Sequence, residues 1–331
     1  MRTGPTFQRL ALGLCLGLAA SLPVHARDLA GELRDAQVAL AAGDFSQAYP
    51  AYLAHQQDNP LAQFNLGLFH QYGWGRPVDM AESCRWQARA AQGGIPAAMQ
   101  IHADCLRHGL AGPPAPEQAA HWYAQAAQAG ILTAPCELAG MYMAGEGVPK
   151  DPRKALELCR QPAEKGLAVA QLRLAGLYLE GDASVRDPVA AFQWMQAAAQ
   201  GHNVEAQYRL GLLLRDGVGR AADPATARVW LERAASQGWL PAYLPTATLY
   251  FDAPTDPATG LPTPENLAKA YLWTSAARQR GVDGQVKEEA RGLAARIQSL
   301  MPASWQPDLD RVVTAHLARF PAPASPTDTS P

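Results

Sequence analysis

The chain repeats itself every 36 residues, and this period limits its fold more than any other feature of the sequence. Each period begins with an alanine, has a small residue five positions later, and has a glycine eleven positions after the alanine in five of the six periods. The alanines are Ala62, Ala98, Ala134, Ala170, Ala206 and Ala242, and the glycines are Gly73, Gly109, Gly145, Gly181 and Gly217. Small residues at fixed places let helices approach closely, so the sequence predicts a stack of equivalent helical units.

The second half of each unit carries the signals that start a helix. Aspartate recurs at one position of the period, with alanine as the exception in the second unit, and the next position is proline in four units, at Pro116, Pro152, Pro188 and Pro224. The aspartates are Asp79, Asp151, Asp187 and Asp223, and Ala115 takes their place in the second unit. Seven positions after this register stands a tryptophan in four units, at Trp86, Trp122, Trp194 and Trp230, with Leu158 in its place in the third unit. An aspartate can cap free backbone amides and proline suits the first helical position. Each unit is therefore predicted to be a helix of about 13 residues, a glycine-containing turn and a second similar helix.

The third unit shows which repeat family this pattern resembles. It contains Ala134, Leu138, Ala139, Tyr142, Gly145, Gly147, Val148, Asp151, Pro152, Lys154 and Ala155 in one uninterrupted stretch. This stretch resembles the Sel-1-like repeat, a relative of the tetratricopeptide repeat. The resemblance covers residues 60–281 and implies an all-α fold, a right-handed α–α superhelix of stacked 36-residue helix-turn-helix repeats. It is specific for the fold and says little about function, because packing residues define the family.

The resemblance divides the chain into five parts. Residues 1–26 are expected to be a signal peptide, residues 27–59 tetratricopeptide-like capping helices, and residues 60–283 six repeats. Two closing helices are expected within residues 284–320, and residues 321–331 are expected to form a disordered tail rich in Pro, Ser and Thr. The sixth unit carries extra residues within 251–265, after which Asn266 is predicted to cap its second helix.

The N-terminus predicts export. Arg2 and Arg9 precede an apolar stretch over residues 10–22, and Val24-His25-Ala26 loosely fits a cleavage site. Cys15 lacks the preceding small residue of a lipidation site, and the apolar stretch is too short to span a bilayer. We therefore expect a periplasmic protein, with secretion as the alternative. The formal net charge of −2 becomes −4 when Arg2 and Arg9 are removed, and the absence of any Lys/Arg-rich segment argues against nucleic-acid binding.

Four cysteines remain after the signal peptide, and an even number in an oxidising compartment suggests two disulfides. In antiparallel helices, residues at equal distances from the turn face each other. Cys84 and Cys105 are centred on the turn at residues 93–95, and Cys136 and Cys159 are centred on the turn at residues 147–148. These pairings are predicted, while the competing pair Cys105–Cys136 would join two parallel helices out of level.

The sequence contains no recognisable catalytic signature, and we expect neither an enzyme nor a cofactor. The glycines are spaced as helix ends, and the periodic aspartates are spaced as helix caps, which does not suggest a shared acid–base pair. His102, Cys105 and His108 recur every three residues, with His121 on the next helix, but such spacing drifts around a helix. We expect no metal site there, because Cys105 is better used in a disulfide.

The resemblance also implies where a partner would bind. In tetratricopeptide-like superhelices the first helix of each unit lines the concave surface. Residues two, six and nine positions after each repeated alanine are then expected to face this groove. The candidate partner-binding residues are Phe64, Leu68, Arg107, Met143, Leu172, Leu179, Tyr208, Leu212 and Arg215. The alternative is that tight coiling buries these side chains between units.

These observations favour a periplasmic scaffold or adaptor that holds a protein partner. Through the resemblance, roles in exopolysaccharide or envelope assembly and in sensor regulation are implied. The alternatives are a secreted host-interaction factor and, less favoured, a hydrolase acting on cell-wall material or β-lactams.

Overall fold

The computed structural model describes residues 28–280 and 284–320, so the proposed signal peptide and C-terminal tail lie outside the described residues. The described residues form sixteen α-helices and three short 3₁₀ helices, and they contain no β-strand. One isolated antiparallel bridge joins Thr255 and Pro262. The predicted all-α fold is confirmed.

The first elements cover the N-terminal end of the stack. They are η1 (Gly31–Leu33), α1 (Arg34–Ala41) and α2 (Phe45–Ala54). Asp44 caps α2 by accepting a hydrogen bond from the Gln47 backbone N–H. Leu33 and Tyr52 are fully buried against Phe69 of the next helix, which anchors this pair to the first repeat.

Six helix pairs follow, and most of their helices have the expected thirteen residues. The first helix of each pair lies at the start of each 36-residue period. The pairs are α3 (Pro60–Tyr72) with α4 (Met80–Gln92), α5 (Pro96–His108) with α6 (Pro116–Gln128), α7 (Ala134–Ala144) with α8 (Pro152–Glu164), α9 (Ala168–Glu180) with α10 (Pro188–Gln200), α11 (Val204–Asp216) with α12 (Pro224–Ser236), and α13 (Tyr243–Phe251) with α14 (Pro264–Arg280). The short η2 (Leu240–Ala242) leads into α13.

The predicted caps set the ends of these helices. The Asp151 carboxylate accepts from the Lys154 backbone N–H at 3.0 Å, and the other three aspartates of this register do the same at their helices. Four of the six first helices end at glycines in the left-handed conformation, such as Gly145 with φ of 75°, and α13 ends at Asp252 with φ of −89°. Gly181 differs, with φ of −62°. The chain turns there through Asp182, whose carboxylate accepts from Ser184.

The prediction that Asn266 caps the second helix of the sixth unit is wrong. The helix begins earlier, at Pro264, and the Thr263 hydroxyl accepts a hydrogen bond from the Asn266 backbone N–H at 3.3 Å. Threonine is itself a good N-cap residue, and the proline that follows it is favoured at the first helical position. Asn266 consequently lies within the first turn of α14.

Both predicted cysteine pairs are disulfide-bonded. Cys84–Cys105 joins α4 to α5 across two repeats, with Cα atoms 5.8 Å apart, and Cys136–Cys159 joins α7 to α8 within one repeat, with Cα atoms 4.4 Å apart. All four residues are buried. The facing positions in antiparallel helices therefore determine the pairing, and the competing Cys105–Cys136 pair does not form.

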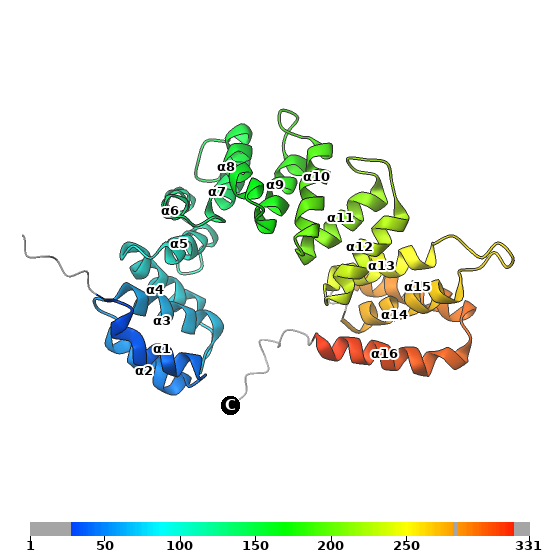
Figure 1. Ribbon diagram of the computed structural model, residues 1–331, viewed down its shortest axis with the longest axis horizontal. Helices are drawn as coiled ribbons and strands as arrows, with labels where there is room; N and C mark the ends of the chain where they lie inside the picture. The colour runs from blue at the N-terminus through cyan, green and yellow to red at the C-terminus, as the bar shows by residue number, and fades with distance from the viewer. Residues whose placement is uncertain (1–27, 281–283, 321–331) are drawn as a thin grey trace, which may run out of the picture.

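The stacked pairs form an open arc (Figure 1). The first helices α5, α7, α9 and α11 lie toward its inner side, whereas α8 and α10 lie outside. At the C-terminal end, α15 (Gly284–Leu300), η3 (Ala303–Trp305) and α16 (Gln306–Arg319) close the stack. Ile297, Val313 and Leu317 of this closing unit are buried with Trp273 of the sixth repeat. Among the described residues, no helix has the length and apolar character needed to cross a membrane.

Candidate functional site

A pocket of about 360 Å³ opens on the inner face of the arc between α5, α7, α9 and α11. We call it the central pocket. Its apolar lining includes Leu172 and Leu177, and two helix glycines, Gly140 and Gly176, leave it open. A Cβ atom added at Gly176 would have no neighbour within 4 Å, and one at Gly140 would have only the Arg107 guanidinium, 4.0 Å away. A larger side chain at either glycine would therefore project into the pocket.

A row of alternating charges crosses the central pocket from repeat to repeat. Arg107 donates two hydrogen bonds to Glu146 Oε2, from Nε at 2.9 Å and Nη2 at 2.7 Å, and its Nη1 lies 3.7 Å from Glu137. Glu137 in turn pairs with Arg173 at 3.2 Å. Hydrogen bonding to Glu146 raises the pKa of Arg107, with burial acting in the opposite direction. A bidentate guanidinium–carboxylate contact fixes geometry as well as charge, so this row holds α5, α7 and α9 in register.

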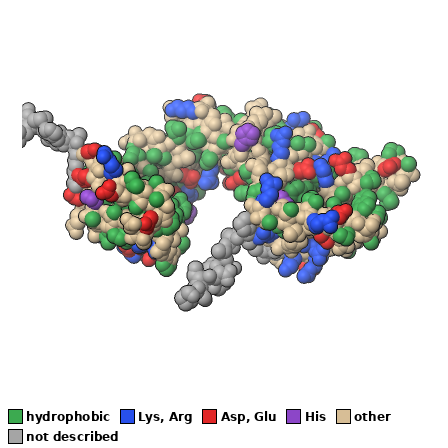
Figure 2. Space-filling model, turned by 60° about the horizontal axis from the view of Figure 1, so that its bottom comes forward, with side chains coloured by type: hydrophobic (Ala, Val, Ile, Leu, Met, Phe, Trp, Pro, Cys, Tyr) green, Lys and Arg blue, Asp and Glu red, His purple; other side chains and the backbone are tan. Residues whose placement is uncertain are grey.

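Two arginines at the pocket remain accessible. The Arg173 side chain is 57% exposed, and Arg209, which pairs with Glu205 one turn earlier on α11, is 42% exposed. A guanidinium has five N–H donors, and a single ion pair leaves several of them free. Acidic and basic side chains indeed lie side by side along the hollow of the arc (Figure 2). The pocket therefore combines an apolar surface with donors that suit carboxylates and backbone carbonyls.

A second pocket of about 450 Å³ lies farther along the same inner face, between α11, α13 and α15. Tyr208 and Arg215 line it together with Leu244 and Thr248, which stand two and six positions after the repeated alanine of the sixth unit. Val286 of α15 contributes to its lining. Asp216 holds Arg215 through two hydrogen bonds, of 2.6 and 2.9 Å, which also raise the pKa of Arg215.

Four of the nine candidate partner-binding residues line one of the two pockets, and five line neither. Arg107 and Leu172 line the central pocket, and Tyr208 and Arg215 line the second pocket. The other five residues line no pocket described here: Phe64, Leu68, Met143, Leu179 and Leu212 are all half-buried. Phe64, Met143 and Leu179 pack against core clusters between helices, which is the burial that the alternative prediction described.

Several pocket residues were missed by the sequence reasoning. Glu137, Arg173 and Arg209 stand three positions after their repeated alanines, whereas the sequence predicts groove residues only two, six and nine positions after them. A signal was available, because the residues at this offset change from Asn65 and Ile101 in the first units to these charged residues in the next three. Gly140 and Gly176 do stand six positions after a repeated alanine, but they contribute open space and not a side chain, so they are absent from the predicted binding residues.

The histidines near Cys105 are not gathered around a common point. His102 packs edge-on against Trp122 with ring centroids 5.2 Å apart, and burial lowers its pKa. His121 contacts the same tryptophan and hydrogen-bonds Gln125. Within residues 28–280 and 284–320 no group of three or more His, Cys, Asp or Glu side chains is arranged to hold a metal ion.

The half-buried Asp104 lies beside the groove. Asp104 accepts a short hydrogen bond from the Tyr123 hydroxyl, joining α5 to α6. Burial raises the pKa of Asp104, and the bond from Tyr123 opposes this effect. The hydroxyl of Tyr123 is in turn held well above its usual pKa by burial and by the neighbouring carboxylate. A carboxylate already engaged in this way is a structural tie between helices.

Comparison with known families identifies the repeat. Sel1 repeats match residues 60–95, 96–131, 136–167, 168–203, 204–239 and 258–282, which together make up more than half of the chain. The chain belongs to the Sel1 repeat family. The match confirms six repeats and places the end of the sixth at the end of α14.

Solved structures with this fold are similar to the chain. One is a protective antigen present in uropathogenic Escherichia coli strains that displays an SLR fold, with a TM-score of 0.61 and 23% identity. The match covers 90% of this chain and 62% of the antigen, so the chain spans less than two thirds of that protein. Another is a Sel1 repeat protein from Oxalobacter formigenes, with a TM-score of 0.60, 23% identity, and coverage of 75% of this chain and 99% of the other. A comparison with the curated proteins finds no match. These similarities establish the fold, and Sel1 repeats as a class mediate protein interactions.

Proposed function

We propose that this chain is an exported scaffold that binds an extended segment of a partner protein in the central pocket. The observation that carries the proposal is the open space at Gly140 and Gly176 on the inner face of the arc. Neighbouring helices leave this surface uncovered although it is partly apolar. A solenoid offers such a concave surface across several repeats, which suits an extended peptide better than a compact ligand.

The charges of the pocket suggest what the segment looks like. Val169, which is 43% exposed, offers apolar contact beside the nearly buried Leu172 and Leu177, and Arg173 and Arg209 offer free N–H donors at the edge of the pocket. A partner segment with an apolar side chain flanked by Asp or Glu would fill the apolar surface and accept hydrogen bonds from the two arginines. Arg107 is already held by Glu146 and Glu137, so its role is to shape the pocket.

Export is the second part of the proposal. The N-terminal 26 residues have the order of charged, apolar and small residues that is typical of a signal peptide. The two buried disulfides support an oxidising compartment, since cytosolic proteins rarely keep structural disulfides. A periplasmic adaptor in envelope or exopolysaccharide assembly, or in sensor regulation, fits these features. Fusing residues 1–26 to a reporter that is active only after export would test this, and an inactive fusion would contradict it.

The binding site is tested by filling the pocket. Gly176→Leu places a side chain in the central pocket without removing any existing contact, because nothing lies within 4 Å of its Cβ position. Gly292→Leu is the matched control, since Gly292 is also a helix glycine with no neighbour in that range and lies on α15, outside the pocket. Both proteins and the wild type serve as bait for envelope extracts, and captured partners are then purified and their affinities measured directly.

The proposal expects one partner whose direct affinity falls at least about tenfold with Gly176→Leu and is unchanged with Gly292→Leu. Equal binding of that partner to both variants would show that the pocket is not the site. Circular dichroism of both variants checks that the helical fold is intact. Turnover of a β-lactam or a cell-wall fragment by the purified protein would contradict a purely binding role.

A further inference from the structure

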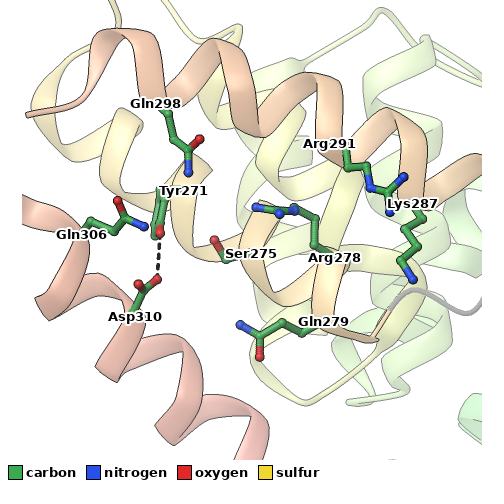
Figure 3. Close-up of a pocket in the computed structure, with 9 residues that line it drawn as sticks. All are labelled: Tyr271, Ser275, Arg278, Gln279, Lys287, Arg291, Gln298, Gln306 and Asp310. Atoms are coloured by element: carbon green, nitrogen blue, oxygen red, sulfur yellow. Dashed lines mark hydrogen bonds between the residues drawn. The ribbon is translucent and has the colours of Figure 1, made fainter. Parts of the chain in front are cut away.

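A separate pocket of about 320 Å³ lies at the C-terminal end of the arc, between α14, α15 and α16 (Figure 3). We call it the terminal pocket. Helices α15 and α16 follow the last matched repeat, so two of its three walls do not belong to the repeats. Its size is at the lower end of the range of small-molecule sites, larger than a bare ion needs.

One end of the terminal pocket is positively charged. Arg278 of α14 and Lys287 and Arg291 of α15 lie together there (Figure 3). Arg291 pairs with Glu288 one turn before it. Among the described residues neither Arg278 nor Lys287 has an acidic partner, whereas the cations of the central pocket are all paired. Within the part of the chain that the structure describes, this end of the pocket thus carries two exposed cations, Arg278 and Lys287, that form no ion pair.

The opposite end is polar and carries one carboxylate. Figure 3 shows Gln298, Gln306, Tyr271 and Asp310 on the side away from the basic group. The buried Tyr271 donates to Asp310 Oδ1 at 2.7 Å, which orients the carboxylate. Burial and this bond raise the pKa of Tyr271. The second carboxylate oxygen and the glutamine amides can still exchange hydrogen bonds with a ligand.

We propose that the terminal pocket binds a small phosphorylated molecule with a hydroxyl-rich body. The phosphate lies at the end formed by Arg278, Lys287 and Arg291, and ligand hydroxyls donate to Asp310 and exchange hydrogen bonds with the glutamines. Guanidinium groups bind phosphate through paired N–H donors, and lysine adds a compact charge. A ligand that is anionic at both ends is disfavoured, because Asp310 would repel the second anion. The pocket therefore favours a ligand with one anionic end and one neutral, hydroxyl-bearing end over a ligand with two anionic ends.

The test measures binding to the purified, disulfide-bonded protein by titration calorimetry or NMR. The probes are glucose 6-phosphate, inorganic phosphate and glucose. Glucose 6-phosphate is expected to bind with a Kd of about 1 mM or tighter, and to bind more tightly than either of its parts alone. Binding should weaken as salt is added, because the site is exposed and charged.

Three variants locate the binding. Arg278→Gln/Lys287→Gln should weaken glucose 6-phosphate and phosphate alike, by at least about tenfold. Asp310→Asn keeps an acceptor for Tyr271 and should weaken only glucose 6-phosphate, leaving phosphate unchanged. Arg311→Gln is the control, because Arg311 is exposed, pairs with Asp308 on the same helix and lies outside the pocket.

Equal loss with Arg311→Gln would overturn the proposal, since the binding would then be a general effect of surface charge. Equal affinity for phosphate and glucose 6-phosphate would also overturn it, because the polar end would contribute nothing. The absence of binding by any probe would do so directly. Circular dichroism melts of all variants ensure that a loss of binding is not a loss of folding.

Discussion

The second residue after each second helix of the repeat adopts the same left-handed conformation in five successive units, yet one of the five is not glycine. The φ values are 84° at Gly94, 91° at Gly130, 84° at Gly166, 62° at His202 and 83° at Gly238. The hydrogen bonds of the turn are kept at the exception: the backbone N–H of His202 donates to Ala199 and that of the next residue donates to Ala198. His202 therefore carries backbone strain that its equivalents avoid.

Two substitutions measure this strain: one introduces a side chain at a left-handed glycine, and the other removes the side chain of His202. A Cβ atom at Gly130 would meet nothing within 4 Å, so Gly130→Ala changes only backbone energetics. The left-handed conformation costs a residue with a Cβ about 1–2 kcal/mol, and the smaller entropy of the unfolded alanine chain returns about 0.4–1 kcal/mol. Gly130→Ala should therefore lower the free energy of unfolding by about 1 kcal/mol. His202→Gly should raise it by about 0.5–1 kcal/mol, since histidine tolerates this region better than most residues.

The assay is urea unfolding of the oxidised protein at pH 7, followed by far-ultraviolet circular dichroism and linear extrapolation. The two sites are two repeats apart and share no contacts, so the double variant should lie close to the wild type. Gly238→Ala should cost more than Gly130→Ala, because its Cβ would lie 2.5 Å from the ring of Phe320. If His202→Gly destabilises the protein while Gly130→Ala is neutral, backbone strain does not explain the glycines. A contact of His202 in the pocket that it shares with Trp230 would then have to account for the histidine.

Three further predictions concern buried or half-buried groups. Replacing Cys136 and Cys159 with alanine should lower the unfolding free energy by about 3 kcal/mol, because the disulfide closes a loop of 23 residues; an unchanged urea midpoint would contradict the loop-entropy reasoning. His102 has a buried Nδ1 without a hydrogen bond and a pKa lowered by burial, so the unfolded chain takes up its proton more readily. Stability should thus fall as the pH drops below about 6.5, and His102→Phe should lose less stability between pH 7 and 5; equal slopes for the two proteins would argue against this. The pH dependence of stability due to Asp104 has the opposite sign. Its raised pKa means that the folded protein holds the proton more tightly than the unfolded chain, so ionisation of Asp104 above that pKa lowers the stability. Asp104→Asn, which still accepts from Tyr123, should therefore be more stable than the wild type at pH 7, with the difference shrinking on acidification; a less stable variant at pH 7 would show that the ionised hydrogen bond outweighs burial.

The sequence predicted what depends on local chemistry and on the period. Helix starts at aspartate and proline, helix ends at glycine, and the two disulfides follow from spacing within one hairpin or between adjacent helices. The prediction for the start of α14 is wrong, because Thr263, three residues before Asn266, caps the helix in its place. Local signals of similar strength can compete, and only the structure shows which one is used.

The central pocket was predicted only in part, for a different reason. Which side chains meet across repeats depends on the rotation from one hairpin to the next, and no single unit encodes that rotation. Arg107 was placed in the groove, but its contact with Glu146 joins residues 39 apart in the chain. The terminal pocket was not foreseen at all, because α15 and α16 lie outside the period and their packing on α14 has no repeat to guide it.

The position of the disulfides determines how the protein would respond to a pulling force. Both lie in the first three of the six repeats, with sequence separations of 21 and 23 residues. Stretching the oxidised chain from its ends cannot extend these two loops, which together hold back about 140 Å of chain length. The last three repeats carry no such crosslink among the described residues, so force would open them to full length while the N-terminal half stayed shortened. Under force, a partner bound to the N-terminal half would therefore remain on a segment whose extension the disulfides limit, while the C-terminal half unfolds and lengthens.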